Sequence, residues 1–264
     1  MASSVTTPST MPTTTTSTSP PQHVSRPITV PVVSTNPPPV TQPTDPGDSS
    51  GGRVDSVAEG APSTTSVIAQ AVAPTLVDIE ASQPGGIEAL GTGIVLTSSG
   101  EILTNDHVVS GATKVLATDV GNGQTYGADL VGTDQVADLA VLQLDGASGL
   151  ETATLGDSAA VVLGEGVVAV GNANGAGGMP SYARGSVTAL HQPIIEQNDV
   201  DGLTQPLDGL IETDAEVLPG DSGGPLVDTE GDVVGVDTAF SAASASGFAI
   251  PIDEALAVAE EIVG

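Results

Sequence analysis

The chain has 264 residues, and 33 acidic against 4 basic side chains give it a formal net charge of −29 at neutral pH. Such a charge leaves no basic surface large enough for nucleic acid, so we exclude nucleic-acid binding and interpret the acidic residues as a solvated coat. The absence of cysteine rules out disulfides, thiolate catalysis and cysteine-bound zinc, and the 2% content of aromatic residues means that aliphatic side chains, which favour strands, must pack the core.

The first part of the chain, residues 1–62, is rich in Ser, Thr and Pro, as in TMPTTTTSTSPP. Its few apolar side chains cannot offset the entropy lost on folding, so we predict a disordered tail or linker here and one folded domain over residues 63–264. The sequence contains no apolar run long enough to span a bilayer, and its start lacks the charged-then-apolar order of a signal peptide. We therefore expect no membrane segment in this chain.

The elements predicted after the tail are mostly short strands. SVIAQAV predicts a helix that ends at Pro74, and a strand follows over residues 76–80. Two pairs of β-rich runs then flank Ser-Ser-Gly and Gly-Asn-Gly, which are hairpin signals. Further strands are predicted in DLAVLQLD, GVVAVGNA, RGSVTALHQPI, GPLVDTEGDVVGVDTAF and SGFAIPI. Many short strands separated by glycine-rich turns indicate an all-β sandwich or barrel.

The last segment, DEALAVAEEIVG, predicts a C-terminal helix. Asp253 stands where an N-cap is expected, and acidic residues occupy the first turn, where they favour a helix. Leu256, Ala259, Ile262 and Val263 recur at helical spacing, so we expect them to form the face that packs on the strands.

The turn PGDSGGPL places Ser222 between an aspartate and two glycines, which raises the question of a nucleophilic serine. A serine hydroxyl needs a base beside it, and the sequence offers three histidines. His23 lies in the predicted tail and His191 at a predicted strand end, so His107, in LTNDHVVS, is the favoured base. Asp138, directly before the strand LAVLQL, is in a position to orient that base.

The glycines of this turn suggest how an oxyanion could be stabilised. Gly220 permits a backbone shape that aims amide N–H groups at one point, as acyl transfer requires. The chain order His, Asp, Ser is also the order of chymotrypsin-type barrels. The residues alone therefore favour a serine hydrolase over a glycine-rich turn without function.

The chain resembles the protease domain of the HtrA/Deg family of trypsin-like serine proteases, and more closely its actinobacterial members, in a set of motifs: GTGIVLTSSGEILTNDHVV, TDQVADLAVLQL, AVGNANG, RGSVTAL, IETDAEVLPGDSGGPL and GFAIPI. The resemblance covers residues from about 66 to 263. It implies a chymotrypsin/trypsin-like double β-barrel with a C-terminal helix. It also implies that His107 is the general base, that Asp138 orients it, that Ser222 is the nucleophile, and that the N–H groups of Gly220 and Ser222 form the oxyanion hole.

The resemblance also suggests a substrate site. Family members prefer small aliphatic side chains before the cleaved bond, and we expect the binding residues to be Glu216, Val217, Leu218, Val236, Asp237 and Thr238. Glu216 stands at the offset from the nucleophile at which trypsin carries its aspartate. Because an unpaired carboxylate is costly to bury, we expect Glu216 to point outward and the site to prefer Val, Ala or Leu.

The same resemblance predicts cleavage of unfolded or misfolded proteins outside the cytoplasm, without a cofactor, by a chain that could form a homo-oligomer. No PDZ domain or transmembrane helix of the family is matched in this sequence. One alternative is a catalytically silent barrel that binds peptides, with the oxyanion turn collapsed. A calcium site in NDVDG, with Asp199 and Asp201, is less favoured because an EF-hand needs more carboxylates and a closing Glu.

Overall fold

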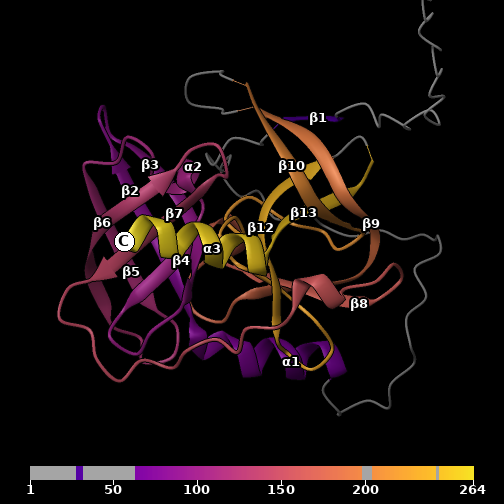
Figure 1. Ribbon diagram of the computed structural model, residues 1–264. Helices are drawn as coiled ribbons and strands as arrows, with labels where there is room; N and C mark the ends of the chain where they lie inside the picture. Colours follow the sequence, from indigo (N-terminus) through magenta and orange to yellow (C-terminus); the bar gives the residue numbers. More distant parts are fainter. Residues whose placement is uncertain (1–27, 32–62, 198–203, 242–243) are drawn as a thin grey trace, which may run out of the picture.

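Two β-barrels side by side make up most of the computed structural model, which describes residues 28–31, 63–197, 204–241 and 244–264 (Figure 1). The predicted tail lies outside the described residues, apart from β1 (Ile28–Pro31), which forms a strand where the sequence predicted no structure. The boundary between tail and domain therefore stays a prediction.

The first barrel contains six antiparallel strands, and it closes in the order β2-β3-β4-β7-β6-β5. Its hairpin turns fall at the predicted Ser-Ser-Gly and Gly-Asn-Gly sequences. A single turn of helix, α2 (Asp106–Val109), follows β4. The strands are β2 (Leu76–Gln83), β3 (Ile87–Val95), β4 (Glu101–Thr104), β5 (Lys114–Asp119), β6 (Thr125–Asp134) and β7 (Leu139–Leu144).

The second barrel closes because β8 pairs with both β9 and β11, while β10, β13 and β12 complete the circuit between them. Strand β9 is long enough to pair with β8 through its first part and with β10 through its second part. Strand β1 adds to β9 in parallel orientation. The strands are β8 (Gly166–Gly171), β9 (Ser181–Gln197), β10 (Thr204–Thr213), β11 (Pro225–Val227), β12 (Val233–Ser241) and β13 (Ser246–Pro251).

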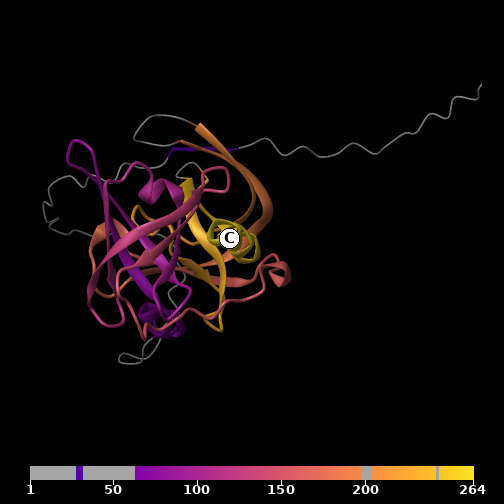
Figure 2. The same cartoon turned by 60° about the vertical axis from the view of Figure 1, so that its left-hand side comes forward.

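Two longer helices pack against the barrels (Figures 1 and 2). Helix α1 (Thr64–Val72) begins where the Ser63 hydroxyl accepts the Ser66 N–H at 3.1 Å, and it continues into the short 3-10 turn η1 (Ala73–Thr75). Helix α3 (Ile252–Val263) lies across both barrels and packs against β6, β7, β12 and β13. Two further 3-10 turns are η2 (Ser158–Ala160), in the connection between the two barrels, and η3 (Ala173–Gly175), between β8 and β9.

The structure corrects two details of the predicted C-terminal helix. Pro251 is the N-cap, and Asp253 lies within the first turn, where its carboxylate accepts the Ser158 hydroxyl at 2.8 Å. Of the predicted face, Ala259 is buried, and Leu256 and Ile262 are partly buried against the core, whereas Val263 is half exposed. Ile252 and Ala255, which were not predicted, are also buried. Starting the helix before Asp253 adds Ile252 and shifts the apolar stripe toward the first turn.

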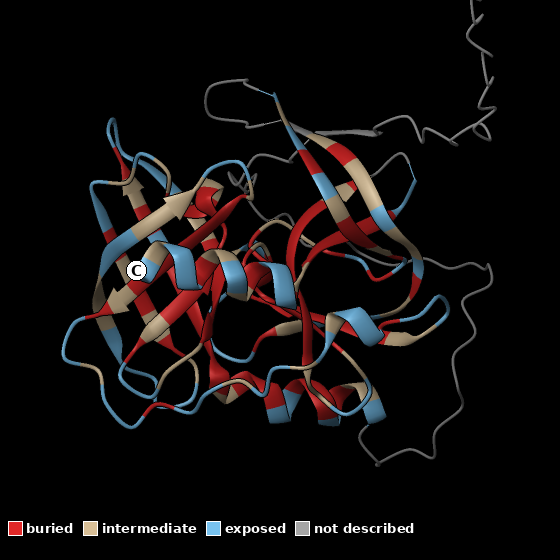
Figure 3. Cartoon of the chain, in the orientation of Figure 1, coloured by how far each residue is buried: buried red, intermediate tan, exposed pale blue. Residues whose placement is uncertain are grey.

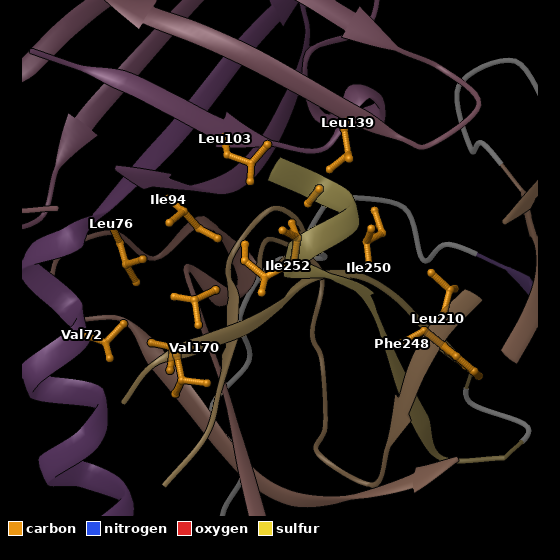
Figure 4. Packing of buried hydrophobic residues seen from close by; sticks show 14 of the residues in the cluster. Val72, Leu76, Ile94, Leu103, Leu139, Val170, Leu210, Phe248, Ile250 and Ile252 are labelled. Carbon is orange, nitrogen blue, oxygen red and sulfur yellow. The ribbon is translucent and has the colours of Figure 1, made fainter. Parts of the chain in front are cut away.

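Buried residues run along the strands of both barrels and one side of the helices (Figure 3). Their apolar side chains form three cores. In β7, for example, Ala140 and Leu142 fill the first barrel, while Leu139 and Val141 face the interbarrel core, which also receives residues of α1, α3 and the second barrel (Figure 4). The third core fills the second barrel and includes Ala249. The predicted all-β double barrel with a C-terminal helix is confirmed. Within the described ranges, no helix has the length and apolar character needed to cross a membrane.

Candidate active site

A histidine and an aspartate of the first barrel meet at the edge that faces the second barrel. His107 lies in α2, and its Nδ1 is 2.9 Å from Oδ2 and 3.1 Å from Oδ1 of Asp138. The His107 backbone N–H also donates to Asp138 Oδ1 at 3.0 Å, so the same carboxylate fixes both the ring and its main chain. A carboxylate at Nδ1 keeps the proton on that nitrogen and leaves Nε2 able to accept one.

Asp138 is held by more groups than the sequence indicated. It adopts the left-handed backbone region, with φ of 55°, which non-glycine residues seldom occupy. The Asn105 side-chain N–H₂ donates to its carbonyl at 2.9 Å, and the Thr238 hydroxyl donates to its Oδ2 at 2.6 Å. Sequence reasoning missed Asn105, although it lies two residues before His107, because a buried amide in a turn leaves no periodic signal.

The predicted nucleophile, Ser222, lies in the turn between β10 and β11 of the second barrel. Its Oγ is 3.5 Å from the carbonyl oxygen of Thr238, whose own hydroxyl contacts Asp138. Across the interface, a Cβ on Gly91 would come within 2.6 Å of Val108 and 3.2 Å of the Ser222 carbonyl, so Gly91 allows the two barrels to approach here. The structure thus brings the three predicted catalytic residues to one place.

Every carbonyl from Pro219 to Ser222 accepts a hydrogen bond, three of them from residues outside the turn and one from Gly224 within it. The Pro219 oxygen accepts from the Asn174 N–H at 2.6 Å, and the Gly220 oxygen accepts from the Thr92 hydroxyl at 2.8 Å. The Asp221 oxygen accepts from the Gly224 N–H at 2.8 Å, and the Ser222 oxygen accepts from the Thr92 N–H at 2.9 Å. All four carbonyls of the turn are therefore hydrogen-bonded within the described part of the protein.

The N–H groups of the same turn are arranged differently. The Asp221 N–H donates to the Leu218 oxygen at 2.9 Å, whereas the N–H groups of Gly220 and Ser222 donate to no acceptor in the described part of the chain. Because a trans peptide directs its N–H opposite to its C=O, anchoring the carbonyls of Pro219 and Asp221 directs these two N–H groups away from the protein body. Two unpaired donors beside a serine hydroxyl are suited to bind a developing oxyanion.

The turn has this shape only with glycine at its key position. Gly220 has φ of 98°, in the region that favours glycine, and a Cβ there would lie 2.3 Å from the Asn172 oxygen. A side chain would therefore displace either the turn or the segment after β8.

Two buried carboxyl groups lie behind the turn. Burial raises the pKa of Asp221 to about 6. Hydrogen bonds from the Leu218 N–H and the Ser181 hydroxyl lower this pKa, but by less than burial raises it. Burial also raises the pKa of Asp237 well above its ordinary value, and the charge of Asp221 raises it further. Asp237 of β12 lies directly opposite Ala249 of β13, and Ala249 belongs to the second-barrel core. Residues opposite each other in a sheet present their side chains on the same face, so the Asp237 side chain faces that core. Both Asp237 carboxyl oxygens are buried without a hydrogen-bond partner among the residues described.

The expected substrate-binding residues fall into different environments. Glu216 is exposed and Leu218 is half-buried, whereas Val217 is buried in the second-barrel core. Val236 is fully buried in the interbarrel core, and the Thr238 hydroxyl is bound to Asp138. The Val236 side chain therefore contributes to the core, and the Thr238 side chain helps to hold Asp138. β-bulges on either side of Val236 change which face each residue of β12 presents.

Of the remaining candidates from the sequence, only His191 lies in the described part of the chain. His191 is an exposed residue of β9 in the left-handed backbone region. His23 and the sequence NDVDG lie outside the described residues. The predictions for these segments therefore stay untested.

A comparison with known families matches residues 91–236 to the trypsin-like peptidase domain. The chain belongs to the trypsin-like peptidase family. It is 33% identical to the serine protease PepD of Mycobacterium tuberculosis, in a match that covers 76% of this chain and 47% of that protein. It is 36% identical to the serine protease Do-like HtrB of Bacillus subtilis, in a match that covers 61% of this chain and 35% of that protein. These relatives place the chain in the HtrA/Deg branch, as the motifs predicted.

A solved structure supports the same assignment. The HtrA-type protease AlgW, determined with a tripeptide, superimposes on this chain with a TM-score of 0.66 at 33% identity, and the match covers 76% of this chain and 64% of AlgW. The chain spans less than half the length of the two curated relatives, 47% of PepD and 35% of HtrB.

Proposed function

We propose that this protein is a serine endopeptidase in which His107, Asp138 and Ser222 form the catalytic triad. The observation that carries the proposal is the Asp138 carboxylate at 2.9 Å from His107 Nδ1, next to a serine turn that presents two unpaired N–H groups. Membership of the trypsin-like peptidase family supports it. The serine in the turn acts as nucleophile, the histidine as base and the aspartate as orienting group.

In the first half of the reaction, Ser222 Oγ attacks the carbonyl carbon of the scissile peptide while its proton passes to His107 Nε2. The negative charge that forms on the carbonyl oxygen is stabilised by the N–H groups of Gly220 and Ser222. Collapse of this intermediate breaks the C–N bond, and His107 returns the proton to the leaving amine. Water then hydrolyses the acyl-enzyme by the same steps, with His107 again as base.

We further propose that the substrates are unfolded or misfolded proteins and that the protein acts outside the cytoplasm. Similarity to HtrA-type proteases supports the first part. For the second part, relatives that include one from Halomonas elongata carry names that describe periplasmic, DegP-like serine endoproteases. Assembly into a homo-oligomer stays a prediction from the resemblance.

A catalytically silent barrel is the alternative that the proposal must exclude. In such a barrel a carbonyl of the turn at Ser222 would take the place of an oxyanion-binding N–H group, whereas here all four carbonyls of the turn accept hydrogen bonds within the protein. This arrangement favours the active form.

The test measures cleavage of a permanently unfolded protein by the wild type and by Ser222→Ala, together with labelling by a fluorophosphonate. The wild type should cleave and become labelled, and the variant should do neither while keeping its circular dichroism spectrum. Equal cleavage by both proteins would overturn the triad, and a wild type that neither cleaves nor becomes labelled would support the silent barrel.

A further inference from the structure

A threonine of the first barrel contacts both segments that shape the serine turn. Thr92 lies in β3 and is 1% exposed. Its Oγ1 accepts the Asn172 N–H at 2.9 Å and donates to the Gly220 carbonyl at 2.8 Å. Its main-chain N–H donates to the Ser222 carbonyl at 2.9 Å. One residue of the first barrel thus joins the end of β8 to the turn before β11.

The direction of these hydrogen bonds follows from the donors available. A hydroxyl has one proton, and because Thr92 Oγ1 already accepts from an N–H, its own proton is directed to the Gly220 carbonyl. The result is a chain from the Asn172 N–H through the Thr92 hydroxyl to the Gly220 oxygen. Hydrogen bonds in such a chain polarise and strengthen one another in a dry environment.

The carbonyl that Thr92 binds belongs to the middle peptide of the turn. The free N–H groups belong to the peptides on either side, Pro219–Gly220 and Asp221–Ser222. The middle peptide is fixed at its carbonyl by Thr92 and at its N–H by the Leu218 oxygen, so it sets the orientation of both neighbours. Rotation of this peptide would turn the two free N–H groups out of alignment.

Thr92 also acts on the first of those neighbours by a second route. It binds the Asn172 N–H, and Asn172 begins the segment whose Asn174 N–H holds the Pro219 carbonyl at 2.6 Å. A single hydroxyl is therefore connected to two of the three peptides that shape the proposed oxyanion hole.

We propose that Thr92 is a positioning residue of this protein, whose hydroxyl aligns the oxyanion-binding N–H groups of Gly220 and Ser222 without touching the substrate. The proposal rests on the proposed function for its kinetic consequence. It goes beyond that function in one respect. The first barrel would supply the acid–base pair and would also control the geometry of the oxyanion site in the second barrel.

Thr92→Val removes the hydroxyl and keeps the shape of the side chain, so it tests the proposal directly. We expect kcat to fall about 10- to 100-fold, less than the 10²–10³ that follows complete loss of an oxyanion donor, with KM within about twofold of the wild type. The inhibition constant of a peptide boronic acid, whose oxygen occupies the oxyanion site, should rise in parallel with the loss in kcat. Thr92→Ser, which keeps the hydroxyl, should stay within about threefold of the wild type.

Thr213→Val is the matched control. Thr213 is fully buried in β10 and its hydroxyl donates to the Ser186 carbonyl at 3.0 Å, away from the serine turn. The Thr213→Val variant should have a lower melting temperature, because it loses a buried hydrogen bond, but it should not show the selective loss in kcat. A loss in kcat that is equal for Thr92→Val and Thr213→Val, or equal for Thr92→Val and Thr92→Ser, would overturn the proposal. If Thr92→Val does not fold, Thr92→Ala, which also lacks the hydroxyl, takes its place in both comparisons.

A spectroscopic readout separates this proposal from the proposed function. Loss of the hydrogen bond in Thr92→Val should shift the ¹³C resonance of the Gly220 carbonyl and speed exchange of the Asn172 amide, and Thr92→Ser should restore both. Unchanged signals in Thr92→Val would overturn the role of Thr92, whatever the activity. A wild type that cleaves no better than Ser222→Ala, with the signals shifted as expected, would instead overturn the proposed function alone.

Discussion

The two barrels share a topology but differ in how they treat polar groups. In the first barrel, His107 and Asp138 at the site are joined by hydrogen bonds. Away from the site, that barrel also buries Asp119, whose pKa is raised by burial and whose Oδ2 has no hydrogen-bond partner within the described residues. The second barrel buries Asp221 and Asp237 behind the serine turn, and Asp237 has no partner within the described residues. Both barrels therefore bury carboxyl groups at a cost in stability, and they differ in where these groups lie: only in the second barrel do they lie directly behind a turn of the proposed site.

The largest effect, on kcat, is expected from changing the Asp138 carboxylate of the first barrel. Asp138→Asn should lower kcat by roughly 10⁴-fold, because an amide at this position favours the wrong tautomer of the histidine. Peptide-cleavage kinetics measure the loss.

Asp134→Asn serves as the control for that change. Asp134 lies in the same turn, where its carboxylate accepts the N–H groups of Val136 and Ala137. It should change kcat by no more than about threefold, as expected for a group outside the reaction centre. An equal loss in both variants would mean that the turn, and not the Asp138 carboxylate, matters.

The next effect concerns the turn of the second barrel. Gly220→Ala introduces a Cβ that would lie 2.3 Å from the Asn172 oxygen, at a residue with φ of 98°. We expect kcat to fall about 10²- to 10³-fold, as for loss of an oxyanion donor. Gly111→Ala is the control, because Gly111 has φ of 71° but open space around its Cβ position. Comparable losses of activity in the two variants would attribute the effect to backbone strain alone.

A smaller effect, on stability, tests the buried carboxyl groups. Because the folded state raises the pKa of Asp237 and raises that of Asp221 to about 6, folded protein binds their protons more tightly than unfolded protein does. Their contribution is therefore complete below the ordinary carboxyl pKa and is lost as the pH rises through the raised values. Asp237→Asn, which cannot ionise, should melt at a higher temperature than the wild type at pH 8, and the difference should shrink toward pH 4.

Thermal melts of the wild type and of Asp237→Asn between pH 4 and pH 8 measure this difference in melting temperature. Glu216→Gln, an exposed acid in the same part of the chain, is the control and should show no such pH-dependent gain. A gain of equal size in both variants would point to the overall negative charge as the cause.

The smallest effect is expected at Glu216 itself. Its exposed side chain lies outside the barrel core, so it should not select a basic residue before the cleaved bond. Mass-spectrometric mapping of cuts in an unfolded protein should find mainly Val, Ala or Leu at that position in both the wild type and Glu216→Ala. Cuts mainly after Lys and Arg that disappear in Glu216→Ala would reverse this prediction.

The strands could be predicted from the sequence, and candidate site residues could be named, because both depend on local patterns. Alternating aliphatic residues and glycine turns marked the strands, and the motifs around His107, Asp138 and Ser222 marked positions that the structure brings together. The role of Thr238 and the buried state of Val236 were not predictable, since they depend on β-bulges that shift the faces of β12. The link from Thr92 to Gly220 joins residues 128 positions apart, and no local signal reports such a contact.

Helix α3 has a consequence for the order in which the domain can assemble. It comes after Ser222 in the chain and packs against strands of both barrels, so during synthesis every triad residue leaves the ribosome before the helix that spans the two barrels. The first barrel, whose strands are contiguous in the chain, can close early, while the interbarrel core gains Ile252, Ala255 and Ala259 last. We therefore expect ribosome-bound chains that end before Ile252 to contain a protease-resistant first barrel and no reactive serine, which a fluorophosphonate added to stalled nascent chains would measure.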